Sequence, residues 1–140
     1  MIRNVLVDTG PLVALLDRRD RYHEWATHQL AGRRPPLLTC EAVLAEAFHL
    51  LRNVYGGGPA LLELVRRRVL TTPFRLDEKV ARVAKLISRY ANVPMSLADA
   101  CLVRLAEQDD ESAVMTLDSD FRVYRRNGRQ VIPIIMPDDV

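Results

Sequence analysis

The segment Ile2-Arg3-Asn4-Val5-Leu6-Val7-Asp8 decides the fold class, because an apolar run stands directly before an acid near the start of the chain. In an extended strand, Val5, Leu6 and Val7 would place apolar side chains on both faces. This is typical of a sheet that helices cover on both faces. Asp8 then falls at the carboxyl end of the strand, the edge where open parallel sheets bind their ligands. The segment therefore predicts an α/β protein with a site at this edge.

The rest of the chain alternates between apolar runs and helical patterns. Strands are expected at residues 2–7, 37–39, 69–74, 113–117 and 131–135. Helices are expected at residues 11–17, 22–31, 40–55, 59–67, 77–90 and 97–108. Strands that alternate with helices form crossover units, so we expect a three-layer α/β/α fold around a parallel sheet of about five strands. Pro133 predicts an edge position for the last strand, because proline cannot donate to a sheet ladder.

Length and composition set the broad class of protein. The chain has 140 residues, 49% hydrophobic and 27% charged, which is typical of one globular domain spanning residues 1–140. No apolar run approaches the roughly 20 residues of a membrane span, and the first apolar segment is short for a signal peptide. We therefore expect a soluble cytoplasmic protein.

Thiols and imidazoles offer no zinc site. Cys40 and Cys101 lie in apolar helical stretches without paired spacing, so both are expected to be free and buried. His23 and His28 are five residues apart, and His49 is isolated. The glycines before Pro59 predict a turn between two helices, since no strand precedes them and no Lys-Ser/Thr follows, as a phosphate-binding loop would require.

Further acids recur at the predicted sheet edge. Asp118 follows the fourth strand directly, and Asp120 comes two residues later. Either acid alone could merely start a turn or cap a helix. Together with Asp8, they favour a site where two strand ends meet.

Two acids lie on predicted helices. Glu46 has Ala42, Val43 and Leu50 as its helical neighbours, so it is expected to point into or beside the core. The alternative is a side chain at the edge of the apolar stripe, paired with an arginine. Asp99 stands three residues after Ser96, the spacing of a capping box, which is an ordinary structural role.

Acids converging in one cleft repel each other unless a cation lies among them. Hard oxygen donors suit Mg²⁺ or Mn²⁺ rather than zinc. Without these five acids the formal net charge of +2 would be +7, and arginines cluster at 33–34, 66–68 and 122–129. Each basic cluster alone could be a solvated face. An acidic metal pocket rimmed by arginine, however, fits a phosphodiester substrate.

Four motifs in order resemble those of PIN-domain nucleases, and among them the VapC-like toxins. They are Val5-Leu6-Val7-Asp8-Thr9-Gly10-Pro11, Ala42-Val43-Leu44-Ala45-Glu46, Leu97-Ala98-Asp99-Ala100 and Thr116-Leu117-Asp118-Ser119-Asp120-Phe121. The resemblance covers nearly the whole chain. It implies a five-stranded parallel sheet between helices and metal-dependent cleavage of RNA, leaving 5′-phosphate and 3′-hydroxyl ends.

The resemblance also assigns roles to residues. Asp8, Glu46, Asp99 and Asp118 match the family's catalytic, metal-binding acids, and Asp120 matches an additional acid of some members. Thr9 and Thr116 match hydroxyl positions that support the site. The family further implies a homodimer and a small antitoxin whose tail enters the acidic cleft. We expect apolar surface on the 40–67 hairpin, including Leu61, Leu62 and Val65, to form the dimer contact.

The mechanism expected from this chemistry is in-line attack of a metal-activated water on a phosphodiester. Asp8, Asp99 and Asp118 would hold the main Mg²⁺ or Mn²⁺, while Glu46 would bind a second ion or orient the water. Arg122 and Arg125 are the expected RNA contacts. An aspartyl phosphotransferase commonly has a second acid two residues after the first, where this chain has Gly10. The remaining alternative is a non-catalytic module that binds RNA or a protein partner.

Overall fold

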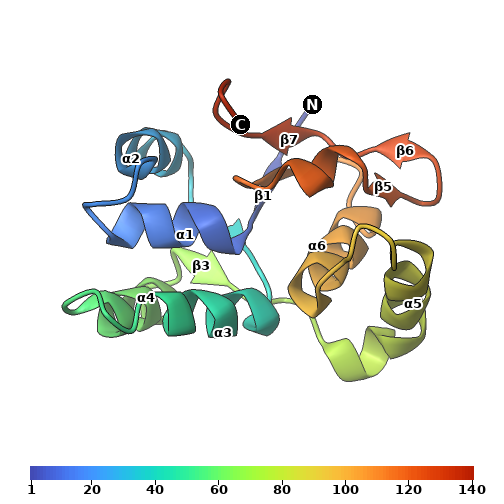
Figure 1. The fold of residues 1–140 in the computed structure, drawn as a ribbon, viewed down its shortest axis with the longest axis horizontal. Helices are drawn as coiled ribbons and strands as arrows, with labels where there is room; N and C mark the ends of the chain where they lie inside the picture. The colour runs from blue at the N-terminus through green and yellow to red at the C-terminus, as the bar shows by residue number, and fades with distance from the viewer.

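The computed structural model describes all 140 residues, and its centre is a parallel sheet of five strands (Figure 1). The strands are β1 (Asn4–Val7), β2 (Leu37–Leu38), β3 (Leu70–Thr71), β4 (Ser112–Met115) and β7 (Ile134–Ile135). Their order is β3-β2-β1-β4-β7, and every pair in it is parallel. The longest ladder joins the two central strands, from Asn4 beside Ser112 to Val7 beside Met115. The predicted sheet is confirmed.

Six α-helices surround the sheet. They are α1 (Thr9–Leu16), α2 (His23–Ala31), α3 (Glu41–Leu50), α4 (Gly57–Arg66), α5 (Leu76–Arg89) and α6 (Leu97–Glu107). Figure 1 shows α1 to α4 gathered on one side and α5 with α6 on the other. Helix α6 is buried along most of its length because it packs against β1 and β4 and is covered by α5. None of the helices is long and apolar enough to span a bilayer.

The structure corrects the predicted boundaries at two places. The helix expected over 40–55 ends at Leu50, and Gly56 with φ of 70° begins the next helix. The strand expected over 131–135 divides in two, because residues Gln130–Val131 form β6, antiparallel to β5 (Arg125–Arg126). Positive φ angles at Asn127 and Gly128 make the intervening turn. Only β7 joins the main sheet, at the edge position that Pro133 predicted.

The apolar surface of the α3–α4 hairpin is smaller than expected. Leu61 is fully buried, since α4 packs against α1, α3 and β3, so its assignment to the surface was wrong. Leu62 and Phe48 do lie at the surface, 55% and 48% exposed. Both cysteines are free and buried, as predicted.

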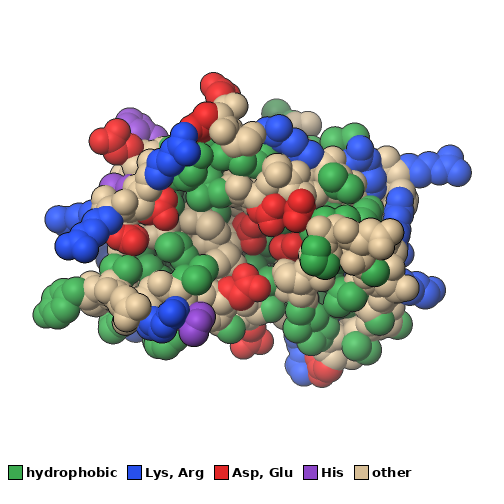
Figure 2. All heavy atoms as spheres, in the orientation of Figure 1, with side chains coloured by type: hydrophobic (Ala, Val, Ile, Leu, Met, Phe, Trp, Pro, Cys, Tyr) green, Lys and Arg blue, Asp and Glu red, His purple; other side chains and the backbone are tan.

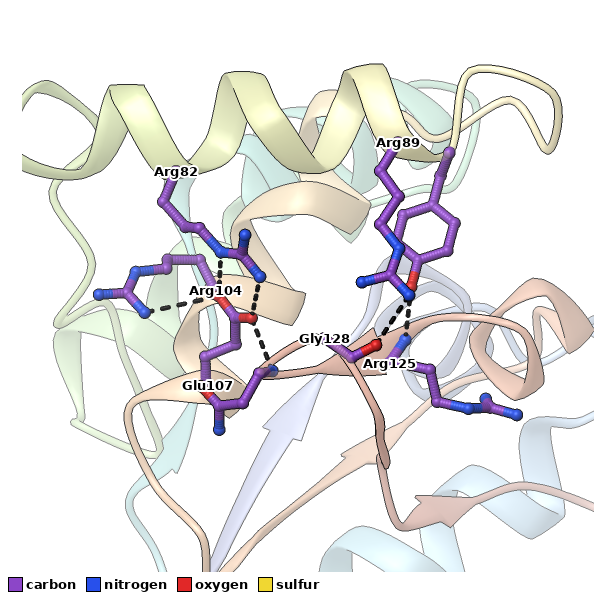
Figure 3. A network of polar contacts seen from close by, with 8 residues as sticks. Arg82, Arg89, Arg104, Glu107, Arg125 and Gly128 are labelled. Carbon is purple, nitrogen blue, oxygen red and sulfur yellow. Dashed lines mark hydrogen bonds and ion pairs between the residues drawn. The ribbon is translucent and has the colours of Figure 1, made fainter.

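A cluster of ion-paired and hydrogen-bonded side chains lies on the α5–α6 side of the molecule (Figure 3). The Glu107 carboxylate, 1% exposed, accepts hydrogen bonds from Arg82 Nε and Nη2 at 2.9 and 2.6 Å. It also accepts from Arg104 Nη1 at 3.5 Å and from the backbone N–H of Asn127 at 2.8 Å. Burial raises the pKa of this carboxyl, but these hydrogen bonds and charges outweigh burial and hold the pKa below its ordinary value.

Candidate active site

The carboxyl ends of β1 and β4 bring the acids together. Asp8 follows β1 directly and is the N-cap of α1. Asp118 stands three residues after β4 and is the N-cap of the short helix η1 (Ser119–Arg122), which contains Asp120. Because β1 and β4 are adjacent and parallel, the two N-caps share one edge of the sheet.

All five predicted acids line one pocket of about 440 Å³. Its lining residues are Asp8, Thr9, Gly10, Glu46, Leu50, Pro94, Ser96, Asp99, Leu117, Asp118 and Asp120. No lysine, arginine or histidine is among them. Figure 2 shows acidic side chains gathered in the middle of this face, with basic side chains around its periphery. The pocket is therefore a site of concentrated, uncompensated negative charge.

Asp8 is the most deeply placed acid, 6% exposed. Its Oδ1 accepts a hydrogen bond from the Thr9 backbone N–H at 2.8 Å, and its Oδ2 accepts from the Thr116 hydroxyl at 2.7 Å. Burial raises its pKa to about 6, in spite of these two hydrogen bonds, and the charges of Asp99 and Asp118 add to the rise. Thr116 also accepts from the Asp118 backbone N–H at 2.9 Å, so one hydroxyl bridges the two strand ends.

Asp99 is held from two directions. The capping box with Ser96 is present, as its spacing predicted, with the Asp99 backbone N–H donating to Ser96 Oγ at 3.0 Å. The Tyr124 hydroxyl also donates to Asp99 Oδ2, at 2.9 Å. Burial raises the pKa of Asp99, the hydrogen bonds oppose this rise, and the Asp118 charge adds to it. The capping role and a place in the pocket thus belong to the same residue.

Tyr124 is the residue that sequence reasoning missed. It is fully buried, and its ring makes edge contacts with Tyr90 and Phe121 at centroid distances of 5.1 Å each. The Tyr90 hydroxyl points elsewhere and accepts from the Arg125 backbone N–H at 2.9 Å. No spacing rule connects Tyr124 with an acid 25 residues earlier, because their contact arises only when the segment at the start of β5 packs against α6.

Glu46 lies differently from the expectation. Val43 and Ala47 form the buried side of α3, whereas Glu46 is exposed and stands at the rim of the pocket. It makes no ion pair with an arginine. Instead its Oε2 accepts from the Thr9 hydroxyl at 3.0 Å, which ties α3 to the start of α1.

The last two acids are linked through the backbone. Asp118 Oδ1 accepts from the Asp120 N–H at 2.9 Å, which leaves its other oxygen free of protein partners. Burial, followed by the charge of Asp118, raises the pKa of Asp120.

The predicted RNA contacts lie just beyond these acids. Arg122 is exposed, while Arg125 Nη1 donates to the carbonyls of Arg122, Val123 and Tyr124 at 2.7–3.2 Å. Arg125 therefore stabilises the end of η1 and presents only part of its guanidinium to solvent.

The donor set of the pocket fits a hard divalent cation. Every charged lining group is a carboxylate, and burial and like charge raise the pKa of three of them, Asp8, Asp99 and Asp120. A cation among them would offset both effects. In the structure no three of these side chains lie close enough together to form a ready-made ligand set.

The fold and this pocket define a class: α/β domains with an acidic site at the carboxyl edge of a parallel sheet. Comparison with known proteins narrows the class, since the PIN domain family matches residues 5–127. The chain belongs to the PIN domain family. Its structure is similar to the crystal structure of Mycobacterium tuberculosis VapC20, described as a sarcin–ricin loop cleaving toxin. That match has a TM-score of 0.77 at 20% identity and covers 86% of this chain and 94% of VapC20. No protein with a curated description matches the sequence.

Proposed function

We propose that this chain is an endoribonuclease that hydrolyses RNA phosphodiester bonds with the help of Mg²⁺ or Mn²⁺. The observation that carries the proposal is the pocket itself, where five carboxylates meet without one cationic side chain. Membership of the PIN domain family supports it. The description of the structurally similar VapC20 as a toxin supports the further proposal that this chain is the toxin of a toxin–antitoxin pair.

Asp8, Asp99 and Asp118 are the residues that would hold the main ion, with Asp120 as an additional ligand. A bound divalent cation supplies a water of lowered pKa and neutralises charge that develops on the phosphate. Thr116 fixes one oxygen of Asp8 and the backbone of Asp118, so it sets the spacing between two ligands.

Glu46 stands at the open rim of the pocket, where it can accept a proton from an attacking water or orient that water toward phosphorus. The Thr9 hydroxyl holds Glu46 by one oxygen and leaves the other free for this role. We assign Thr9 and Thr116 to positioning, because each hydroxyl donates a hydrogen bond to an acid of the pocket.

The proposal includes partners outside the pocket. Arg122, and the free part of the Arg125 guanidinium, would contact RNA phosphates beside η1. A small antitoxin would bind the acidic cleft. The exposed apolar residues Phe48 and Leu62 would contribute to a homodimer, and the protein would act in the cytoplasm.

The test is cleavage of a labelled RNA pool by the purified protein, freed of any antitoxin. Mg²⁺ or Mn²⁺ should support cleavage and EDTA should stop it. Asp99→Asn should abolish cleavage while RNA binding stays intact or becomes tighter, because a negative charge near phosphate is lost. Asp138→Asn is the matched control, since Asp138 is exposed and its carboxylate makes no hydrogen bond or ion pair. Cleavage that survives both EDTA and Asp99→Asn would overturn the proposal, and no cleavage by wild type would favour a non-catalytic module.

A further inference from the structure

A second hollow adjoins the acidic pocket. Its volume is about 690 Å³, and Leu50 at the end of α3 lines both cavities. We call it the Arg18–Tyr55 groove; it is lined by Leu16, Asp17, Arg18, Arg19, Leu50, Asn53, Val54 and Tyr55. These residues come from the last residue of α1 and the segment after it, and from the last residue of α3 and the turn before α4. The two regions lie at the same end of the molecule in Figure 1. The groove thus continues the catalytic cleft in one direction.

The charge of this groove is opposite to that of the pocket beside it. Arg18 and Arg19 are exposed, and neither guanidinium makes an ion pair or a hydrogen bond within the chain. Arg82 and Arg104, in contrast, are both engaged by Glu107. Asp17 is the one acid in the lining, and its Oδ1 accepts from the Arg19 backbone N–H at 3.0 Å. Two free guanidiniums are therefore available to an anionic ligand.

The groove also offers surfaces on which a flat ring can stack. Tyr55 is fully exposed and its hydroxyl has no partner, while Leu50 is 53% exposed. The amide of Asn53, beside them, can both donate and accept hydrogen bonds. Aromatic side chains next to arginines are the usual means of binding unpaired bases and their phosphates.

We propose that the Arg18–Tyr55 groove binds the single-stranded RNA segment on one side of the bond that is cut. A base stacks on Tyr55 and Leu50, and the adjoining phosphates pair with Arg18 and Arg19. This inference rests on the proposed nuclease function, because it is continuity with the acidic pocket that brings an RNA strand to the groove. The groove would fix which unpaired nucleotides can accompany a scissile phosphate, and it would therefore contribute to substrate choice.

The first experiment measures affinity in the Asp99→Asn background, with a fluorescent single-stranded RNA in EDTA. Replacing Arg18 and Arg19 together with Ala should weaken binding about tenfold or more and lower the salt slope by roughly 1.4 units, as for two phosphate contacts on a single strand. Tyr55→Ala should weaken binding about fivefold to tenfold with the salt slope unchanged, since stacking releases no counterions.

The matched control replaces Arg34 and Arg67 together with Ala. Both are exposed, neither has a side-chain partner, and neither lines the groove or the acidic pocket. The control removes the same charge, so an equal loss of affinity would mean general electrostatics and would overturn the proposal. Unchanged RNA affinity in the groove variants would also overturn it.

The second experiment locates the groove along the RNA. An RNA that wild type cuts at one position is shortened stepwise from its 5′ or its 3′ end, and kcat/KM is measured for wild type and for the Arg18/Arg19 variant. The proposal predicts that the defect of the variant disappears when one end is shortened and persists when the other is. A defect that is independent of both ends would contradict it. If wild type cut no RNA, the proposed function would fail, while the affinity measurement would still decide whether the groove binds RNA.

Discussion

Asp8 and Glu107 are both buried acids, but their surroundings shift their pKa values in opposite directions. Glu107 faces two guanidiniums and a backbone N–H, and its pKa lies below the ordinary value. Asp8 faces a hydroxyl, a backbone N–H and further acids, and its pKa is raised to about 6. Counted over the whole residue, Asp8 is 6% and Glu107 8% exposed, so the partners of each carboxylate make the difference.

The presence or absence of cationic partners thus distinguishes an acid with a structural role from an acid of the candidate active site. A buried carboxylate whose charge is balanced by partners within the protein needs no bound cation. A buried charge that is left among like charges destabilises the fold unless something outside the chain neutralises it.

The largest effect on stability is expected at the paired carboxylate. Glu107→Gln removes a charge that two arginines share and should lower the free energy of unfolding by about 3 kcal/mol, as for other buried ion pairs that lose one partner. Urea denaturation measures this. Glu63→Gln is the control, because its pair with Arg66 is exposed and should cost under about 1 kcal/mol. Equal losses in the two variants would mean that burial of the Glu107 pair has no consequence.

Substitution of Asp8 is expected to raise the free energy of unfolding, whereas substitution of Glu107 lowers it. The Asp8 pKa of about 6, against an ordinary 3.8, means that the folded state holds the proton more tightly than the unfolded state. The resulting stability is complete below pH 3.8 and is lost as the pH rises through about 6. Asp8→Asn should therefore raise the free energy of unfolding by about 2 kcal/mol at pH 7.5 in EDTA, and change it little at pH 4. A gain that does not depend on pH would contradict this explanation.

A smaller effect is expected from the hydroxyl that holds Asp99. Tyr124→Phe leaves the ring in place and removes only the hydrogen bond to Asp99 Oδ2. Hydrogen-bonding partners of metal ligands orient them, so Mn²⁺ should bind about tenfold more weakly to this variant. Tyr90→Phe is a close control: its ring packs on Tyr124, but its hydroxyl accepts from the Arg125 backbone. Equal Mn²⁺ affinity in the two variants would remove Tyr124 from the site.

Much of this site could be predicted because strand ends and helical spacing are local properties. Asp8 and Asp118 follow apolar strands, and parallel strands must end at one edge, so their meeting required only the correct fold class. Asp99 was placed in the site by the resemblance of its motif, because its spacing from Ser96 indicated only a capping box. These inferences needed no knowledge of side-chain torsions.

The predictions were wrong where packing between distant segments determines which side chains are buried and which strands pair. The sequence of α4 does not show that Leu61 faces α1 and β3 rather than a second subunit. Glu46 directly precedes Ala47, a buried residue of α3. One residue corresponds to a rotation of about 100° around the helix axis, and the apolar pattern alone did not resolve this difference. Val131 joined a hairpin because the turn at Asn127 and Gly128 reverses the chain before β7.

A calorimetric titration of Mn²⁺ into the metal-free protein at pH 7.5 tests directly whether the unpaired acids, and not the paired one, bind the cation. Wild type and Glu107→Gln should bind Mn²⁺ equally well, because the paired carboxylate has no use for a cation. Asp8→Asn should bind at least tenfold more weakly, because it loses the deepest ligand of the pocket. Equal binding by Asp8→Asn and wild type would contradict a cation site at Asp8.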